Sequence, residues 1–433
     1  MNAERIEPQP YLKVLLLAAL LGLFSAAITF IFLVMVELGQ TLIWEQAAHA
    51  VGVSVPVFTL VICTLGGLLV GVLVKFFGDH SGIFAEMMLE FGKTGRFNYR
   101  HAPGIVITAL ASLIAGGSLG PEAPLADACG SLGTLTAEKL KLDERETRSL
   151  SFSGLSGMLA AMLTSPFGGA LLGLESARSG IDYAWTLFPS LVASACATIA
   201  FVVLTGSFFG TLYAFPAYQP RMVDLLLAVP LGLLGALAGG LFIILFKLLR
   251  RIMLPLKTHL IVRGLIGGLG LGLAGALTAY LHLPTVLFSG EAETAVLIDR
   301  AAEIGVVMLI VLALVKLSIT ALCLSTGWKG GYIFPTMFAG TALGLAAHAI
   351  FPDIPVAVAV AATMGGAMVA TMKAPIFSAL FVMVLVQPET SPVIAIAVIV
   401  GTLATARLSM VSAPPKPAEA AAALNPQPNP SAR

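Results

Sequence analysis

Long apolar segments, separated by short polar stretches, recur along almost the whole chain. The clearest lie at 15–36, 55–74, 105–119, 186–204, 225–245, 262–281, 306–324, 356–370 and 394–406. Most of them fall short of the roughly 20 residues that a straight membrane-spanning helix needs, or barely reach that length. We therefore expect many tilted, broken or re-entrant helices, which a bilayer tolerates only where the backbone lines a protein cavity.

The composition assigns these segments to a lipid bilayer. Of the 433 residues, 58% are hydrophobic and only 11% are charged, and the mean hydropathy is +0.96. A soluble core cannot bury that much apolar surface. The formal net charge of +1 gives no reason to expect nucleic acid as a partner. We predict an all-α polytopic membrane protein whose N-terminal residues 1–13 are cytoplasmic, since Arg5 and Lys13 precede the first span.

The cysteines and histidines are too scattered to predict a metal site. The four cysteines lie far apart in apolar stretches, where a thiol commonly packs as a small hydrophobic group. No pair of them has the spacing of metal ligands, and the six histidines are equally dispersed. We expect no metal and no cofactor.

One pattern of glycine, proline and leucine occurs twice. Its first copy returns 211 residues later: Gly116, Gly120, Pro124, Leu132 and Gly133 become Gly327, Gly331, Pro335, Leu343 and Gly344. This spacing predicts two homologous halves, 54–206 and 262–409, within a membrane domain at 14–409. An odd number of spans between equivalent points would invert one half relative to the other. Residues 410–433, rich in proline and alanine, are expected to form a disordered tail.

Each copy of the repeat contains a glycine and proline break within apolar sequence. Glycine lets the backbone approach a ligand closely, and proline suits the first turn of a helix. The free N–H groups and the positive dipole end of a helix start favour an anion. In the second break, at 330–335, we predict that Tyr332, Ile333 and Phe334 supply backbone donors and that their side chains line the path.

The first break, at 118–124, differs from the second because it carries a carboxylate, Glu122. An unpaired carboxylate within a membrane is costly, and it therefore indicates a function. Deprotonated Glu122 could occupy the anion site itself, and protonation would release it. The alternative is a helix cap that faces water.

Ser81 begins an amphipathic stretch that runs through Glu90. Its hydroxyl could donate a hydrogen bond to an anion from the side opposite the two breaks. The ordinary alternative is that Ser81 is the N-cap of a helix.

Together, these motifs resemble those of the CLC family of chloride channels and chloride/proton antiporters. Stretches at 80–84, 120–124 and 331–335 match the family's three signatures, and the similarity covers roughly 14–409. The motif glycines and prolines are Gly82, Gly120, Pro124, Gly331 and Pro335. The resemblance implies a homodimer in a bacterial inner membrane, with one pore for chloride or a related anion per subunit. Each pore would be built from an inverted repeat of short tilted helices.

The resemblance also implies roles for individual residues. Ser81 matches the serine that coordinates chloride, and Glu122 matches the external gating glutamate. Tyr332 and Ile333 match the family's backbone donors, while Phe334 falls one place later.

Two departures from the family pattern concern proton coupling and the inner end of the site. Counting from Pro166, the family's inward proton-transfer glutamate falls on Ser176, and Glu175 lies one place earlier, so these two residues form the candidate proton path. No tyrosine follows Tyr332, so the family's C-terminal tyrosine has no counterpart. We therefore expect passive or weakly proton-coupled anion transport gated by Glu122. A chloride/proton antiporter with a non-standard proton path is the alternative.

Two rival functions rest on other residues. Asp127, a little over one turn after Glu122, could join it in a cation site of a proton-coupled transporter. The segment 154–157 mimics the Gly-x-Ser-Gly motif of intramembrane serine proteases, but small residues at helix contacts explain it more simply. We predict no enzymatic activity.

The remaining charges are given structural interpretations. Four basic residues near segment ends are expected to extend toward the membrane interface: Arg178, Lys316, Lys329 and Lys373. Lys329 could instead draw anions toward the second break. Glu291 and Glu293 are predicted to lie in a loop between helices.

Overall fold

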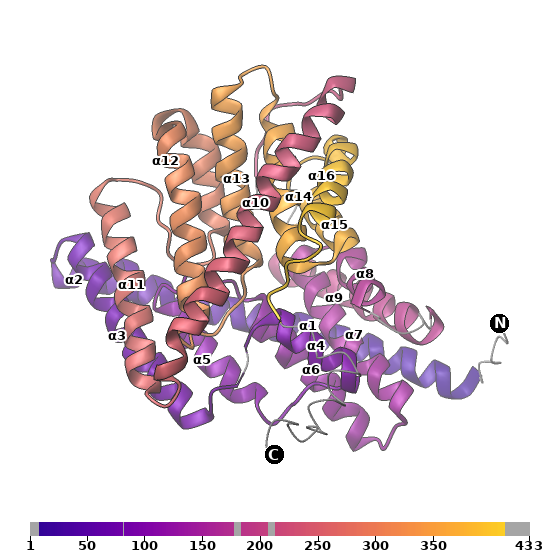
Figure 1. Cartoon of the computed structure of the whole chain (residues 1–433). Helices are drawn as coiled ribbons and strands as arrows, with labels where there is room; N and C mark the ends of the chain where they lie inside the picture. Colours follow the sequence, from indigo (N-terminus) through magenta and orange to yellow (C-terminus); the bar gives the residue numbers. More distant parts are fainter. Residues whose placement is uncertain (1–7, 81, 177–182, 207–212, 412–433) are drawn as a thin grey trace, which may run out of the picture.

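The structure is a computed structural model that describes residues 8–80, 82–176, 183–206 and 213–411 (Figure 1). The part of the chain so described is helical and contains no strand. Its helices are α1 (Pro8–Gln40), η1 (Thr41–Ala47), α2 (Ala48–Val51), α3 (Val55–Phe77), α4 (Phe84–Thr94), α5 (Ala102–Ile114), α6 (Glu122–Lys139), α7 (Glu144–Leu163), α8 (Pro166–Ser176), η2 (Tyr183–Leu187), α9 (Phe188–Thr205), α10 (Met222–Met253), η4 (Leu254–Leu256), α11 (Leu260–Tyr280), α12 (Glu291–Ser325), α13 (Ile333–Ile350), α14 (Val356–Met372), α15 (Pro375–Leu385), η5 (Pro388–Thr390) and α16 (Ser391–Ala404).

Within these ranges, seven helical segments are long and apolar enough to cross a membrane. They are Tyr11–Val51, Val55–Phe77, Ala184–Thr205, Met222–Leu256, Leu260–Tyr280, Glu291–Ser325 and Ile333–Ile350. Shorter apolar helices of 10–17 residues accompany them, as the uneven lengths of the apolar segments predicted. The protein is therefore a multi-pass, all-α membrane protein.

The two copies of the sequence repeat have matching local structure. The helices that follow the breaks, α6 and α13, are both 18 residues long, and α8 and α15 are both 11 residues long. Gly116 and Gly327, which are equivalent in the repeat, have φ angles of 92° and 95°. This left-handed backbone is open to glycine at little cost, which explains why glycine recurs at that position.

The two halves lie on either side of a shared boundary. Figure 1 shows α10 and α12 to α16, drawn in pink to yellow, gathered above the indigo and magenta helices of the first half. The halves contact one another through α3 with α11 and through α8 with α15. Glycines allow the first of these contacts, because a Cβ atom added at Gly67 would lie 2.5 Å from the carbonyl oxygen of Gly264.

The acidic pair that precedes the long α12 helix was assigned wrongly from the sequence. Glu291 and Glu293 lie in the first turn of α12, not in a loop, and Gly290 before them has a φ of 91°. Acidic side chains in a first turn interact favourably with the helix dipole. The helix is interrupted at Gly305, where φ is 78°, so α12 consists of two helices joined at a kink.

The prediction that basic residues extend toward the interface is also wrong for two lysines. Lys316 is fully buried, and its Nζ donates to the carbonyl oxygens of Val286, Leu287 and Phe288 at 3.1, 2.9 and 2.8 Å. Its ammonium therefore fixes the segment that leads into α12. Lys329 is 6% exposed. Arg178 lies outside the described residues, as do residues 412–433 of the predicted tail.

Candidate anion pathway

The two breaks of the repeat are in direct contact. Gly120 N donates to Gly331 O at 2.9 Å, and Gly331 N donates to Gly120 O at 2.6 Å. The helices that follow, α6 and α13, therefore start beside one another. Neither glycine can carry a side chain without displacement, because an added Cβ would overlap the carboxyl group of Glu122.

Glu122 is the first residue of α6, and its side chain crosses to the other half. The residue is 1% exposed, and its Oε1 accepts a hydrogen bond of 2.6 Å from Ile333 N, at the start of α13. Its second oxygen, Oε2, has no hydrogen-bond partner among the described residues. A cap facing water, the alternative considered from the sequence, is wrong because the carboxyl group is buried. The group lies where the N–H groups and the dipole of α13 would hold an anion.

The residues of the second break present their backbone to the Glu122 carboxylate. Tyr332 is the N-cap of α13, and Tyr332, Ile333 and Phe334 are all buried. The Tyr332 ring packs against Phe242 with centroids 5.7 Å apart, and the Phe334 ring packs against Phe381 at 5.9 Å. The structure thus brings these three predicted residues together with Glu122 and places their side chains in the surrounding core.

The motif prolines hold equivalent positions in the two helices. Pro124 and Pro335 are each the third residue of their helix, α6 and α13, and both are buried. The first N–H groups of a helix have no partner within it, so a residue without an N–H loses no helical hydrogen bond there. The two prolines therefore permit a helix start to be buried with fewer unpaired donors.

Ser81, the predicted side-chain donor, lies outside the described residues. Its neighbour Gly82 lies against Lys329, because an added Cβ would come within 2.8 Å of the Lys329 Cδ. Helix α4 begins at Phe84, with Ile83 before it. Both interpretations of Ser81, as an anion donor and as a helix cap, concern a residue outside the described part of the chain and stay predictions.

Glu175 also reaches a helix start in the other half. Its Oε1 accepts from Ile376 N at 2.5 Å and its Oε2 from Phe377 N at 2.8 Å, both at the start of α15. Ser176 is the last residue of α8. Glu175 lines a cavity of about 420 Å³, which Tyr332 also lines. The contact with α15 was not predicted from the sequence. The related signal is that Pro166 and Pro375, at the starts of α8 and α15, are 209 residues apart, close to the 211-residue spacing of the repeat.

Asp127 does not join Glu122. The two residues are five apart on α6, and at about 100° per residue this separation places them on different faces. Asp127 lines a separate cavity of about 210 Å³ together with His80, Glu90 and His101. No group of three or more metal-ligating side chains occurs among the described residues.

Ser156, the nucleophile of the protease alternative, is a buried residue of α7. No histidine forms a hydrogen bond with its hydroxyl in the part of the chain that the structure describes. The neighbouring Gly157 packs against Gly22, because an added Cβ would lie 3.1 Å from the Cα of Gly22. This motif is therefore explained by close helix packing.

Comparison with known proteins assigns the family. A model of the voltage-gated chloride channel family matches residues 66–406. The chain belongs to this family. Two bacterial relatives are named as the ion-transport protein YfeO, one from Escherichia fergusonii and one from Shigella sonnei. Each is 26% identical to this chain over 382 residues, which cover 86% of this chain and 88% of the relative.

Two solved structures of other proteins have the same fold as this chain. A slow cyanobacterial Cl⁻/H⁺ antiporter is 20% identical, with a TM-score of 0.80 over 93% of this chain and 95% of that one. A CLC-type fluoride/proton antiporter is 19% identical, with a TM-score of 0.77 over 94% and 98% of the two chains. The predicted CLC resemblance and the inverted-repeat CLC-type architecture are confirmed.

Proposed function

We propose that this protein moves chloride or a similar monovalent anion past the paired helix starts, and that Glu122 is the gate. The observation that carries this proposal is the 2.6 Å hydrogen bond from Ile333 N to Glu122 Oε1. A carboxylate oxygen that accepts from a helix start occupies the position that a transported anion would take. Glu122 and the anion then compete for the same donors.

Protonation of Glu122 opens the site in this mechanism. A neutral carboxyl group interacts more weakly with backbone N–H groups and with the helix dipole than a carboxylate does. An arriving anion would then accept hydrogen bonds from the backbone at Tyr332, Ile333 and Phe334, with the Ser81 hydroxyl as a further donor. Because these groups carry only partial charges, the anion is held strongly enough to bind and weakly enough to leave.

Passive or weakly proton-coupled transport is the proposed mode. Ser176 cannot transfer protons as a glutamate does, whereas Glu175 carries a carboxyl group at the cavity that Tyr332 also lines. A chloride/proton antiporter is therefore the second candidate, with protons passing between Glu175 and Glu122 by way of that cavity. The two antiporters of the same fold favour retaining this candidate.

The family relationship supports two further parts of the proposal. We propose that the protein is a homodimer with one pore in each subunit. We also propose that it resides in the bacterial inner membrane, because its YfeO relatives are bacterial. Mass photometry of the protein in detergent measures the first, since it separates the mass of a dimer from that of the single 44.9 kDa chain.

The deciding experiment records chloride and proton movement together from liposomes that contain the purified protein or Glu122→Gln. Chloride efflux without proton movement supports a passive pathway. Chloride efflux accompanied by stoichiometric proton uptake supports the antiporter, provided that Glu122→Gln abolishes the proton uptake. Absence of chloride movement at every pH and voltage contradicts the anion function.

A further inference from the structure

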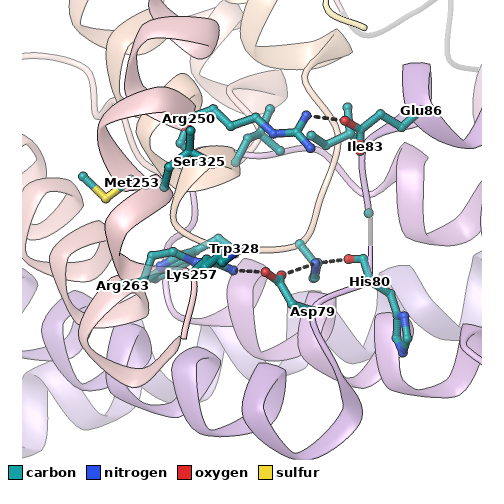
Figure 2. Close-up of a pocket in the computed structure, with 15 residues that line it drawn as sticks. Asp79, His80, Ile83, Glu86, Arg250, Met253, Lys257, Arg263, Ser325 and Trp328 are labelled. Carbon is teal, nitrogen blue, oxygen red and sulfur yellow. Dashed lines mark hydrogen bonds and ion pairs between the residues drawn. The ribbon is translucent and has the colours of Figure 1, made fainter. Parts of the chain in front are cut away.

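A polar cavity of about 240 Å³ lies beside the loop that precedes α4 (Figure 2). His80 and Gly82, the neighbours of Ser81 in the sequence, line this cavity. Figure 2 shows Arg250 reaching toward Glu86 on one side, and Asp79 lying between Arg263 and His80 on the other. Four basic residues line the cavity against two acidic ones, so it carries an excess of positive charge: Arg250, Lys257, Arg263 and Lys329 against Asp79 and Glu86.

Asp79 is shared between two cations. Its Oδ2 accepts from Arg263 Nη2 at 2.6 Å, and its Oδ1 lies 3.7 Å from Lys329 Nζ. The side chains of Arg263 and Lys329 are 10% and 7% exposed, whereas that of Asp79 is 39% exposed. Asp79, Arg263 and Lys329 together form what we call the Asp79 cluster. One carboxylate and two cations give this cluster a net charge of +1.

Lys329 connects the loop before α4 to the second break. Its Nζ donates to His80 O, and its backbone N donates to Ser112 Oγ at 3.1 Å. It precedes Ile333, the partner of Glu122, by four residues, so the two backbone positions are at most about 14 Å apart. A buried charge at such a distance is screened less than a charge on the surface.

From this geometry we propose that Lys329 is a positioning residue that also sets the affinity of the anion pathway. Its ammonium group holds the backbone at His80 against the second break and supplies positive potential there, while Asp79 lowers that potential so that the anion can leave. The inference rests on the proposed function and assigns to the Asp79 cluster the balance between binding and release.

Two neutral substitutions distinguish this role from a purely structural one. Lys329→Met lowers the net charge of the Asp79 cluster to zero, and Asp79→Asn raises it to +2. A unit charge at this distance in a medium of intermediate dielectric changes the binding constant by about five- to tenfold. We therefore expect chloride to bind about five- to tenfold more weakly to Lys329→Met and more tightly to Asp79→Asn by a similar factor.

The test measures chloride affinity by isothermal titration calorimetry on the purified full-length protein, with efflux from liposomes in parallel. Lys329→Arg retains the charge and should keep the wild-type affinity within about twofold. Lys139→Met removes an exposed lysine at the far end of α6, about 25 Å along the helix from Glu122, and should leave the affinity unchanged. Thermal unfolding of each variant shows whether it is folded.

Opposite shifts for Asp79→Asn and Lys329→Met support the proposal. The proposal is overturned if the chloride affinities of both variants change in the same direction, or if a folded Asp79→Asn variant binds chloride as the wild type does. If Lys329→Met fails to fold, the affinity of Asp79→Asn decides the test. These results leave the proposed function standing as long as the wild type binds and transports chloride. If the wild type transports none, the proposed function fails first.

Discussion

Two carboxylates of the first half bind helix starts of the second half, but their surroundings differ. Glu122 is buried and accepts through one oxygen from Ile333 N. Glu175 is half-buried, accepts through both oxygens from Ile376 N and Phe377 N, and lines a cavity of about 420 Å³. Both carboxylates accept hydrogen bonds from a helix start, so access to water is the main difference between them. This difference is the basis of the proposal that Glu122 competes with the anion and that Glu175 exchanges protons with water.

The number of hydrogen bonds distinguishes the two carboxylates further. A carboxylate held by two backbone donors loses more on leaving than one held by a single donor. We therefore propose that Glu175 remains bound to the start of α15 while an anion passes. Glu122 accepts the 2.6 Å hydrogen bond from Ile333 N through Oε1, while its Oε2 accepts none from the described residues, and we propose that protonation of this carboxyl group favours its release.

The largest expected effect is the response of Glu122 to pH. Lowering the pH adds a proton to this carboxyl group, removes its negative charge and weakens its hold on Ile333 N, so wild-type chloride efflux should rise. A charge-assisted hydrogen bond contributes about 1.5–3 kcal/mol, which corresponds to a change of roughly tenfold or more in occupancy. Glu122→Gln should show high efflux that is independent of pH. A pH response that persists in this variant would assign the gate to another group.

A smaller effect is expected at Glu175. Glu175→Gln cannot carry a proton, so any proton movement coupled to chloride should fall by roughly tenfold while chloride efflux continues. Simultaneous recording of the two ions in liposomes measures both. If chloride and proton fluxes fall together and the variant also unfolds at lower temperature, Glu175 only anchors α15. Glu175 would then differ from Glu122 by stabilising the fold and not by carrying protons.

The enclosure of Glu122 is tested by adding one methyl group. Gly331→Ala places a Cβ over the Glu122 carboxyl group and should destabilise the protein by about 1–3 kcal/mol while reducing the pH response. Gly92→Ala, on α4, meets nothing within 4 Å and should stabilise by roughly 0.5–1 kcal/mol. Thermal unfolding and efflux of both variants provide the comparison. Equal effects of the two would contradict a tightly enclosed carboxylate.

The smallest effect is expected at Ser176. Because its hydroxyl does not titrate in the physiological range, Ser176→Ala should change proton and chloride fluxes by less than about twofold. The same liposome recording, with Glu175→Gln as the reference, measures this. A loss of proton movement in Ser176→Ala would place the proton path at this residue instead of Glu175.

The sequence predicted the features that follow a local or repeated pattern. The repeat located both helix starts, and the structure shows that its equivalent glycines Gly116 and Gly327 share a left-handed backbone. The apolar segments fall on α1, α3, α5, α9, α10, α11, α12, α14 and α16 but include neither α7 nor α13. Both are almost entirely buried in protein, so the polar and small residues of α7 and the glycines of α13 pack against other helices.

Contacts between the two halves could not be predicted in this way. The hydrogen bonds from Ile376 N and Phe377 N to Glu175 join residues about 200 positions apart, and that from Lys329 Nζ to His80 O joins residues 249 positions apart. No periodicity links such pairs. The sequence also suggested that Lys329 extends to the interface, because a long cationic side chain near a segment end usually does so. Its buried position depends on Asp79, which only the fold brings near.

Chloride affinity as a function of pH, measured by calorimetry on the wild type and Glu122→Gln, tests most directly whether the Glu122 carboxylate competes with the anion. The account predicts that wild-type affinity increases as the pH falls and that Glu122→Gln binds chloride tightly at every pH. Equal affinities of the two proteins across the pH range would contradict it.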